Sequence, residues 1–400
     1  MRIVVAAAPG MGHLLPAVPV AWAAVSAGHQ VLVATTGPSL DMAQRLGFAA
    51  VDVSDDGEAY AAYRRLAARE METRPDGHDL SSAWRRFADP GEDTDRPDDL
   101  LLHLVACTVD RTARVIRDWG GDLVLYTTFL CGGQLAASRA GVPSVRVGIG
   151  LPHPDFPGLH PERPAPSAAV LDVCPPSLRP EGAGRNGWPL RFVPCNGGGV
   201  LPGWLQRRAV RPRVCVTWGS VLDQHGMGPT LDAVLAALEP TGAEVVLATG
   251  SATGTDGPLP ANVRRVGWVP LSALLPGCAA LIHHGGSGTT FTACAQGVPQ
   301  LVIPQVADQP LNAQAVSDAG IGVAIPRTRP GVREVRDALE RVLDDPAVHR
   351  ACERVRLEIA SMPQPGDLVP RLAGLAPAAD RPPAPAASPV PRPAEATPAP

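Results

Sequence analysis

The chain has 400 residues, of which 45% are hydrophobic, and a formal net charge of −4. This length and apolar content predict two domains, each able to bury a core. Nucleic-acid or anionic-membrane binding is not expected, because both need clustered positive charge and the chain has no basic tract. The absence of lysine excludes a catalytic or P-loop lysine. The expected partner is a small molecule.

The cysteines and the N-terminus bear on the cellular compartment. The 8 cysteines are scattered and form no C-x-x-C pair, so we expect reduced thiols. Pro9, Gly10 and Gly12 interrupt the apolar run at the N-terminus, and no uninterrupted apolar run of about 18 residues occurs. We therefore expect a cytoplasmic protein without a membrane span.

In the first half of the chain, short aliphatic runs alternate with helical stretches, which is typical of parallel βαβ layering. Helices are expected up to Ala27, around 40–46, across 100–117 and up to Ala140. The acid-rich region 54–99 is expected to be an insert of loop and helix. The expected strands are 2–8, 30–36, 49–53, 122–126 and 141–147.

Proline and glycine dominate residues 150–212, so no periodicity is visible and we expect a variable segment followed by a linker. A second alternating series then repeats the architecture. Its expected strands are 213–220, 244–250, 263–269, 280–284, 300–304 and 323–326.

This pattern predicts an α/β fold of two Rossmann-like domains. We place the N-terminal domain at 1–195, the linker at 196–212 and the C-terminal domain at 213–374. Residues 375–400 are mostly proline and alanine near the end and are expected to form a disordered tail. Monomer and homodimer both remain open.

A glycine-rich turn follows the strand that ends at His284. Gly285-Gly286-Ser287-Gly288 leads into a helix expected to start near Thr289, which concentrates free backbone N–H groups and the positive helix end at one point. An anion is expected there. Neither a Walker A pattern nor G-x-G-x-x-G is present, so a P-loop nucleotide and a dinucleotide are not expected.

The stretch HHGGSGTTFTACAQGVPQLVIPQVADQ (283–309), preceded by VRRVGWVPLSALLP, resembles the nucleotide-sugar signature of GT-B glycosyltransferases. The similarity is greatest to bacterial enzymes that attach deoxysugars to natural products. It spans most of the chain and is looser in the N-terminal half. It implies two domains facing each other across a cleft, and an inverting transfer from a nucleoside diphosphate sugar to a small aglycone by direct displacement. No cofactor beyond this co-substrate is implied.

The resemblance assigns the donor to the C-terminal domain. His284, the turn and the Thr289 hydroxyl would bind the pyrophosphate, while Asp308 would bind sugar hydroxyls and Trp268 would lie against the base. His283 is expected to pack inward. The full set of donor-binding residues is Ser220, Trp268, Val269, His284, Gly286, Ser287, Gly288, Thr289, Asp308 and Gln309.

Thr292 bears on the choice of nucleoside. Relatives that use UDP-sugars carry a glutamate at the corresponding position, where it accepts hydrogen bonds from the ribose hydroxyls. Deoxyribose lacks the 2′-hydroxyl, so a dTDP-linked donor is expected.

His13 lies just past the first strand, at the edge where α/β sheets bind ligands, and resembles the general base of the family. An imidazole with a pKa near neutrality could take the proton of an acceptor hydroxyl. The alternative is that His13 only orients the turn, with Gly10 and Gly12 letting substrate approach the backbone. Gly12 and Thr127 are expected on the acceptor side.

Thr127 stands where relatives often place the aspartate that pairs with this histidine. Another carboxylate, such as Asp52, Asp55 or Asp56, would then have to stabilise the imidazolium. Three further histidines, His29, His103 and His349, are given no chemical role.

Asp93-Thr94-Asp95 has the D-x-D spacing that chelates a metal beside a diphosphate in another glycosyltransferase fold. It sits in an acidic loop with no preceding apolar strand, and helix-end N–H groups already compensate the charge. We predict no metal requirement. Two other functions stay open: a nucleotide-sugar epimerase of the same fold, and a non-catalytic partner that binds sugar nucleotides.

Overall fold

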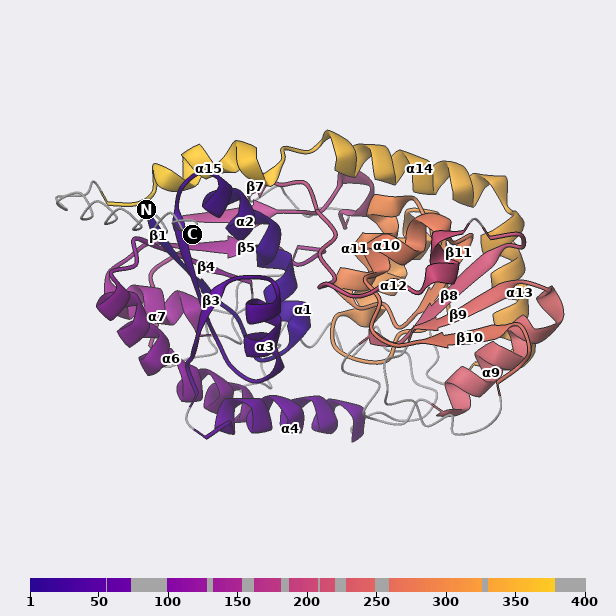
Figure 1. The fold of residues 1–400 in the computed structure, drawn as a ribbon, viewed down its shortest axis with the longest axis horizontal. Helices are drawn as coiled ribbons and strands as arrows, with labels where there is room; N and C mark the ends of the chain where they lie inside the picture. The colour runs from indigo at the N-terminus through magenta and orange to yellow at the C-terminus, as the bar shows by residue number, and fades with distance from the viewer. Residues whose placement is uncertain are drawn as a thin grey trace, which may run out of the picture.

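The computed structural model describes residues 1–54, 56–72, 99–127, 132–152, 162–180, 187–207, 209–219, 228–248, 259–325 and 330–377. Within them, two parallel sheets stand side by side with helices against their faces (Figure 1). Ser220, Asp55, the D-x-D of 93–95 and tail residues 378–400 lie outside the described residues.

The first sheet has seven strands in the order β3-β2-β1-β4-β5-β6-β7, all parallel. Its central strands β1 and β4 are almost wholly buried, because helices cover both faces of a parallel sheet. The strands are β1 (Arg2–Ala6), β2 (Gln30–Thr35), β3 (Ala49–Asp52), β4 (Leu123–Tyr126), β5 (Ser144–Val147), β6 (Ala169–Asp172) and β7 (Trp188–Pro189).

Helices on this sheet follow the predicted alternation. The region 54–99 contributes one described helix, α4, which packs along α6. The helices are α1 (Met11–Leu14), α2 (Val18–Ser26), α3 (Pro38–Arg45), α4 (Glu58–Glu72), α6 (Asp99–Trp119) and α7 (Gly133–Ala140).

The proline- and glycine-rich region 150–212 adds two strands to the first sheet. A variable segment followed by a linker was expected there, and the region supplies β6 and the edge strand β7. Strands this short carry too few residues for an alternating pattern, and proline is tolerated at a sheet edge because its missing N–H is not needed there. These two strands were not predicted from the sequence.

The second sheet has six parallel strands in the order β10-β9-β8-β11-β12-β13. This order matches the doubly wound dinucleotide-fold order of 3-2-1-4-5-6, so the expectation of a second Rossmann-like unit is confirmed. The strands are β8 (Arg213–Thr217), β9 (Glu244–Ala248), β10 (Val263–Val266), β11 (Ala280–His283), β12 (Gln300–Val302) and β13 (Gly322–Ala324).

The helices of this half pack on both faces of the second sheet. They are α9 (Gly228–Leu238), α10 (Leu271–Leu274), α11 (Ser287–Gln296), α12 (Gln309–Asp318) and α13 (Val332–Asp344). Short 3-10 helices occupy Leu15–Ala17, Pro176–Leu178, Gly203–Gln206, Glu239–Thr241 and Leu275–Gly277.

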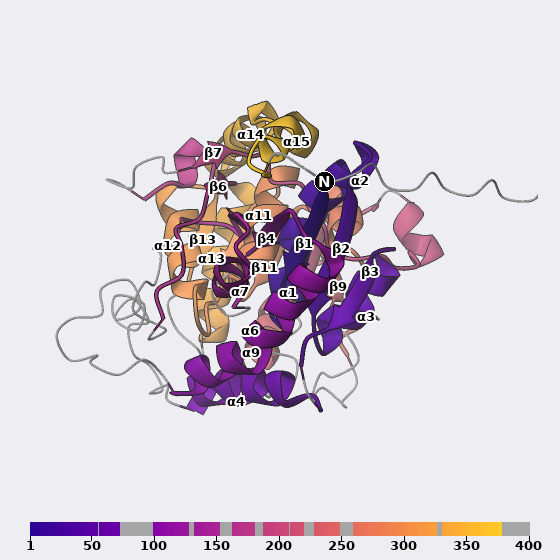
Figure 2. The same ribbon diagram turned by 90° about the vertical axis from the view of Figure 1, so that its left-hand side faces the viewer.

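After α13 the described part of the chain returns to the first sheet. Helix α14 (Pro346–Ser361) packs on α11, and α15 (Pro365–Ala373) packs on α2. Figures 1 and 2 show both helices along one side of the molecule, opposite α4. The domain limits given above remain a prediction, but the last helix lies against the N-terminal half.

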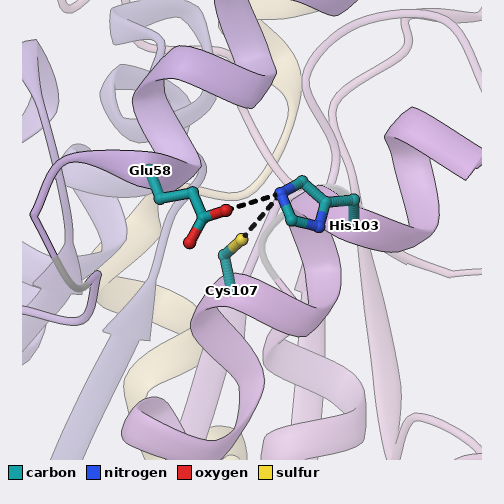
Figure 3. Close-up of side chains that lie close together, drawn as sticks. All are labelled: Glu58, His103 and Cys107. Atoms are coloured by element: carbon teal, nitrogen blue, oxygen red, sulfur yellow. Dashed lines mark hydrogen bonds and ion pairs between the residues drawn. The ribbon is translucent and has the colours of Figure 1, made fainter.

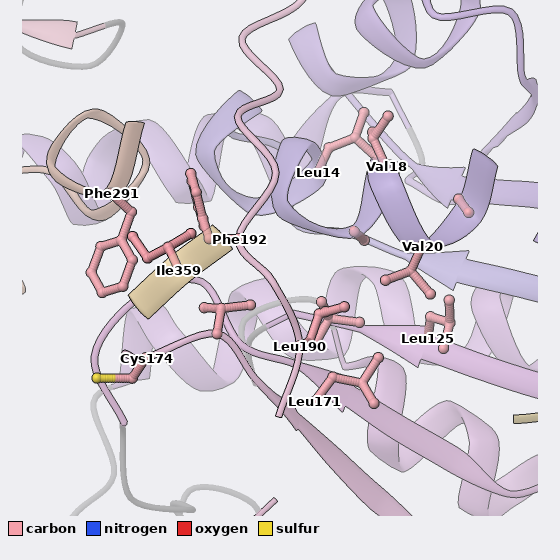
Figure 4. Packing of buried hydrophobic residues seen from close by; sticks show 14 of the residues in the cluster. Leu14, Val18, Val20, Leu125, Leu171, Cys174, Leu190, Phe192, Phe291 and Ile359 are labelled. Atoms are coloured by element: carbon pink, nitrogen blue, oxygen red, sulfur yellow. The ribbon is translucent and has the colours of Figure 1, made fainter. Parts of the chain in front are cut away.

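One apolar core joins the two halves. Phe192, which follows β7, lies beside Phe291 of α11 with ring centroids 5.5 Å apart, and Ile359 of α14 lies close by (Figure 4). These buried side chains belong to the same cluster as Leu14 and Leu125 of the first unit. The halves are therefore held together by packing as well as by the linker.

Candidate active site

The predicted site residues follow the strands at the centre of each sheet. In the first sheet, β1 and β4 lie next to each other, and the chain order reverses between them; His13 and Thr127 follow these strands. In the second sheet, β8 and β11 hold the same positions, and Gly219 and His284 follow them. Ligands bind α/β sheets at such reversal points.

The glycine turn starts helix α11 without a side-chain cap on Gly286. The Thr289 N–H already donates to the Gly286 carbonyl at 3.0 Å, so the Ser287 and Gly288 N–H groups are the ones open to an anion. Gly285 has φ +92°, and a Cβ there would lie 2.9 Å from Val302 Cγ1 and 3.0 Å from the Gln309 carbonyl. Only glycine fits this position. Gly288 is exposed and Thr289 is partly exposed, as a phosphate-binding turn requires.

His284 is packed between two glycines. A Cβ on Gly286 would lie 2.4 Å from His284 Nε2, and one on Gly219 would lie 2.9 Å from it. Burial lowers the pKa of His284 to about 4, although the Asp308 charge and the Thr217 backbone favour protonation. The ring is therefore neutral near pH 7 and can offer one N–H donor to a phosphoryl oxygen.

His283 packs inward, as expected. It is fully buried, its Nε2 lies 3.0 Å from Gln300 Oε1, and its Nδ1 accepts a hydrogen bond from the Gly285 N–H at 3.0 Å. The ring therefore shapes the glycine turn from behind and is not directed at a ligand.

Asp308 is held against the same turn. Its Oδ2 accepts hydrogen bonds from Ser287 Oγ at 2.5 Å and from Asn312 Nδ2 at 3.0 Å. Ala307, just before it, has a φ of +52°, an uncommon backbone conformation for a residue with a Cβ. Asn312 was not predicted from the sequence; the only available signal was its position four residues after Asp308.

Gln309 is buried, and its amide oxygen accepts hydrogen bonds from the backbone N–H groups of Gln305 and Val306 at 2.8 and 2.9 Å. That oxygen is therefore engaged in shaping its own loop. Only the amide nitrogen of Gln309 would be left to serve a sugar hydroxyl.

Trp268 presents a half-exposed ring on the second unit, with 43% of its surface accessible. Its Nε1 donates to the Asn196 carbonyl at 3.2 Å, which fixes the ring against the linker. Val269, by contrast, has its side chain in the core beside Val266, so only its backbone could reach a nucleoside.

Asn196 ties the surrounding elements together. Its Oδ1 accepts the Ser272 N–H at 2.9 Å, and its Nδ2 donates to Thr292 Oγ1 at 3.2 Å. The fully buried Thr292 hydroxyl in turn donates to the Gly288 carbonyl at 2.6 Å. Sequence reasoning missed Asn196 because it lies in the linker; its position before three glycines was the only signal.

The first unit brings His13 against Tyr63 of α4. Their rings meet edge to face, and Tyr63 Oη lies 3.5 Å from His13 Nε2. A Cβ on Gly10 would lie 2.4 Å from Tyr63 Oη, whereas one on Gly12 would meet nothing within 4 Å. Gly10 thus makes room for a protein side chain, and Tyr63, 50 residues from His13, was not predicted.

Thr127 does not replace the expected carboxylate. Its hydroxyl donates to the His13 backbone carbonyl at 2.5 Å and so positions the turn rather than the ring. Asp52, one of the suggested substitutes, accepts the Ser54 N–H at 3.0 Å through Oδ1. The expected aspartate role is therefore not filled by Thr127.

The protonation of His13 differs from the expectation of a pKa near neutrality. Burial lowers the pKa of His13 to about 4, with the Asp308 charge opposing the shift. Burial also raises the pKa of Tyr63 to about 12, and Asp308 adds to that increase. Asp308 belongs to the second unit, so the electrostatic environment of His13 and Tyr63 includes a charge from the other half of the chain.

A further close approach joins the halves at the glycine turn. A Cβ on Gly150, after β5, would lie 2.6 Å from Ser287 Oγ and 3.1 Å from Phe291 Cε2. The N-terminal half therefore reaches the start of α11 directly.

Comparison with known proteins identifies the architecture. Two family models match, the N-terminal domain of erythromycin biosynthesis protein CIII-like proteins over residues 22–219 and their C-terminal domain over residues 232–375. The chain belongs to the erythromycin biosynthesis protein CIII-like family. This CIII-like protein is 36% identical to the elloramycin glycosyltransferase ElmGT of Streptomyces olivaceus, covering 93% of this chain and 97% of that protein.

Solved structures agree with the family. The glycosyltransferase SnogD from Streptomyces nogalater superposes with a TM-score of 0.74 at 32% identity, covering 94% of this chain and 99% of its own. The spinosyn rhamnosyltransferase SpnG complexed with thymidine diphosphate gives a TM-score of 0.74 at 28% identity, covering 93% and 100%. The CIII-like protein is thus a GT-B glycosyltransferase of the antibiotic deoxysugar type, and the resemblance seen in the sequence is confirmed. None of its described helices is long and apolar enough to cross a membrane.

Proposed function

We propose that this CIII-like protein transfers a deoxysugar from a dTDP-linked donor to a small natural-product aglycone, with inversion at the anomeric carbon. The observation that carries the proposal is geometric: the first unit, which holds His13 beside Tyr63, reaches the glycine turn of the second unit, where a Cβ on Gly150 would lie 2.6 Å from Ser287 Oγ. A donor on the second unit and an acceptor on the first would meet between these groups.

The proposed reaction is a single displacement. The acceptor hydroxyl would replace the long contact between Tyr63 Oη and His13 Nε2, and the neutral imidazole would take its proton. The acceptor oxygen forms a bond to the anomeric carbon from one face while the bond to the diphosphate breaks on the other. The α11 N-terminus and the His284 N–H would stabilise the charge on the departing diphosphate.

The donor residues keep their assigned roles within the proposal. The turn residues Gly286–Thr289 would bind the phosphates and Trp268 the base, with Asp308 beside the sugar. The nucleoside preference rests on Thr292, which is buried and bonded to Asn196 and Gly288. It offers no carboxylate to a ribose 2′-hydroxyl, which supports a deoxyribonucleoside donor.

Isothermal titration of dTDP and UDP tests the donor site. We expect tighter binding of dTDP, and a loss of at least about tenfold in His284→Ala and Asn196→Ala. Asn262 gives a matched control, because its Nδ2 donates to two backbone carbonyls, Leu238 O and Ala243 O, before β10. Asn262→Ala should lower stability and keep the dTDP affinity. Equal affinities for dTDP and UDP would refute the nucleoside assignment.

Turnover assays separate the proposal from its alternatives. A transferase consumes a dTDP-deoxysugar only with an acceptor, whereas an epimerase would change the sugar without one. Binding of dTDP without turnover on any aglycone, alone or with pooled intermediates, would instead indicate a non-catalytic partner. Because the helix end already compensates the diphosphate charge, EDTA should leave transfer running; activity lost in EDTA and restored by Mg²⁺ would refute this.

A further inference from the structure

Three side chains with metal-binding atoms converge where helices α4 and α6 cross (Figure 3). Glu58 lies in the first turn of α4, while His103 and Cys107 are four residues apart on one face of α6. Beside them the helices pack through Ala59, Ala62 and Leu104, all fully buried. The backbone positions of the three groups are therefore fixed by the fold.

Their spacing fits one tetrahedral ion. His103 Nε2 lies 3.1 Å from Glu58 Oε1 and 3.6 Å from Cys107 Sγ, and all three ligand atoms lie within 4.8 Å of one another. Zinc bonds of about 2.0 Å to nitrogen and oxygen and about 2.3 Å to sulfur, at tetrahedral angles, put ligand atoms about 3.3–3.6 Å apart. A small adjustment of the side chains would bring all three onto one ion.

Without a metal ion, the three side chains cannot all form hydrogen bonds with one another. Imidazole Nε2 carries either one proton or one lone pair, yet here it faces both a carboxylate and a thiol. Nε2 can donate a hydrogen bond to Glu58 or accept one from Cys107, but it cannot do both. One of the two contacts therefore has no hydrogen bond. A metal ion bound by the Nε2 lone pair, the carboxylate and the thiolate uses all three.

The surroundings suit a divalent cation. Glu58 and His103 are 55% and 42% exposed, so an ion can enter from solvent. A cavity of about 280 Å³ borders the cluster, lined by Asp110, Arg111 and Arg114 besides Glu58 and Cys107. One thiolate and one carboxylate balance the two charges of the ion, which leaves a neutral complex beside the arginines, and the cavity has room for water as a fourth ligand.

We propose that Glu58, His103 and Cys107 form a binding site for a divalent transition metal of the zinc class, with water as the fourth ligand. On binding, the Cys107 thiol releases its proton to solvent and its sulfur bonds the metal. The ion joins α4 to α6 and takes no part in sugar transfer. Since α4 also carries Tyr63, the site stabilises the helix that positions this tyrosine against His13. No chemical role could be assigned to His103 from the sequence, because Glu58 is distant in the chain.

Titration of the full-length, metal-free protein with Co²⁺ tests the proposal. Binding of one equivalent should produce the thiolate-to-cobalt charge-transfer band and the intense visible bands of a tetrahedral site. Cys107→Ser should remove the charge-transfer band, and His103→Ala should weaken binding by more than about 100-fold. Cys278→Ser is the matched control, because Cys278 is another partly buried free cysteine, and it should keep the wild-type spectrum.

A second readout guards against simple misfolding. Zn²⁺ should raise the thermal unfolding temperature of the wild type and of Cys278→Ser, but not that of Cys107→Ser, with all three proteins showing the same circular dichroism without metal. The absence of a charge-transfer band in the wild type would overturn the proposal. So would equal Co²⁺ affinity in the wild type and His103→Ala.

Discussion

Three histidines at the site share one physical condition and differ in use. Burial lowers the pKa of His13, His283 and His284 to between about 3 and about 4, so all are neutral near pH 7. Both ring nitrogens of His283 form hydrogen bonds within the protein. His284 faces the glycine turn and His13 faces Tyr63, so the proposed function gives these two, and not His283, a contact with substrate.

The His13 environment predicts how transfer depends on pH. A base whose pKa is lowered to about 4 stays unprotonated until the pH falls to that value. We therefore expect kcat/KM to be flat across neutral pH and to fall only near pH 4, as far as the fold survives. His13→Ala should lower kcat by about 10²–10⁴-fold while dTDP binding is kept. A rate that falls near pH 6.5, or normal turnover in His13→Ala, would contradict the assignment.

At the scale of elements, the N-terminal half of the site depends on how closely α4 approaches the turn after β1. Tyr63 reaches His13 only because residue 10 has no Cβ, since the added atom would lie 2.4 Å from Tyr63 Oη. Gly10 has an ordinary extended backbone with φ −91° and ψ 138°. Its requirement for glycine is therefore steric and not conformational.

Substitution at Gly10 tests this contact. Gly10→Ala should lower stability by displacing Tyr63, and the loss should shrink in a Tyr63→Ala background, with a coupling of about 0.5–3 kcal/mol. Gly12→Ala is the matched control for stability, because its Cβ meets nothing within 4 Å. Urea unfolding of the single and double variants measures the coupling. Strictly additive losses would mean that the two residues do not interact.

At the scale of the whole molecule, α15 matters because it comes late in the sequence yet packs against α2 and completes the core of the N-terminal half. Leu372 of α15 is fully buried in the core that also contains α2 residues. Leu372→Ala should therefore cost about 2–5 kcal/mol of unfolding free energy. Leu357 of α14, 53% exposed, gives the control, and Leu357→Ala should change it by no more than about 0.5 kcal/mol. Equal effects in denaturant titration would refute the role of α15.

The central strands and the glycine turn could be predicted from sequence because their signals are local: aliphatic runs, then Gly285–Gly288 before a helix. The strands β6 and β7 could not, because they are short, they lie in a proline-rich region without visible periodicity, and pairing alone defines them. Tyr63 and Asn196 could not either, since their roles arise from contacts with His13 and with Trp268, Ser272 and Thr292. Such contacts exist only once the elements have packed.

The chain passes between its two halves twice, once after β7 and once between α14 and α15. These two connecting segments are in contact. The Arg191 N–H donates to the Pro363 carbonyl at 2.7 Å, and Arg191 Nε donates to the Met362 carbonyl at 3.2 Å. A chimera joined at a single point would therefore pair an N-terminal half with a foreign α15. To recombine donor and acceptor preferences between relatives, an engineer should exchange a cassette with two junctions, after the linker and before Pro365, leaving α15 with its native partner.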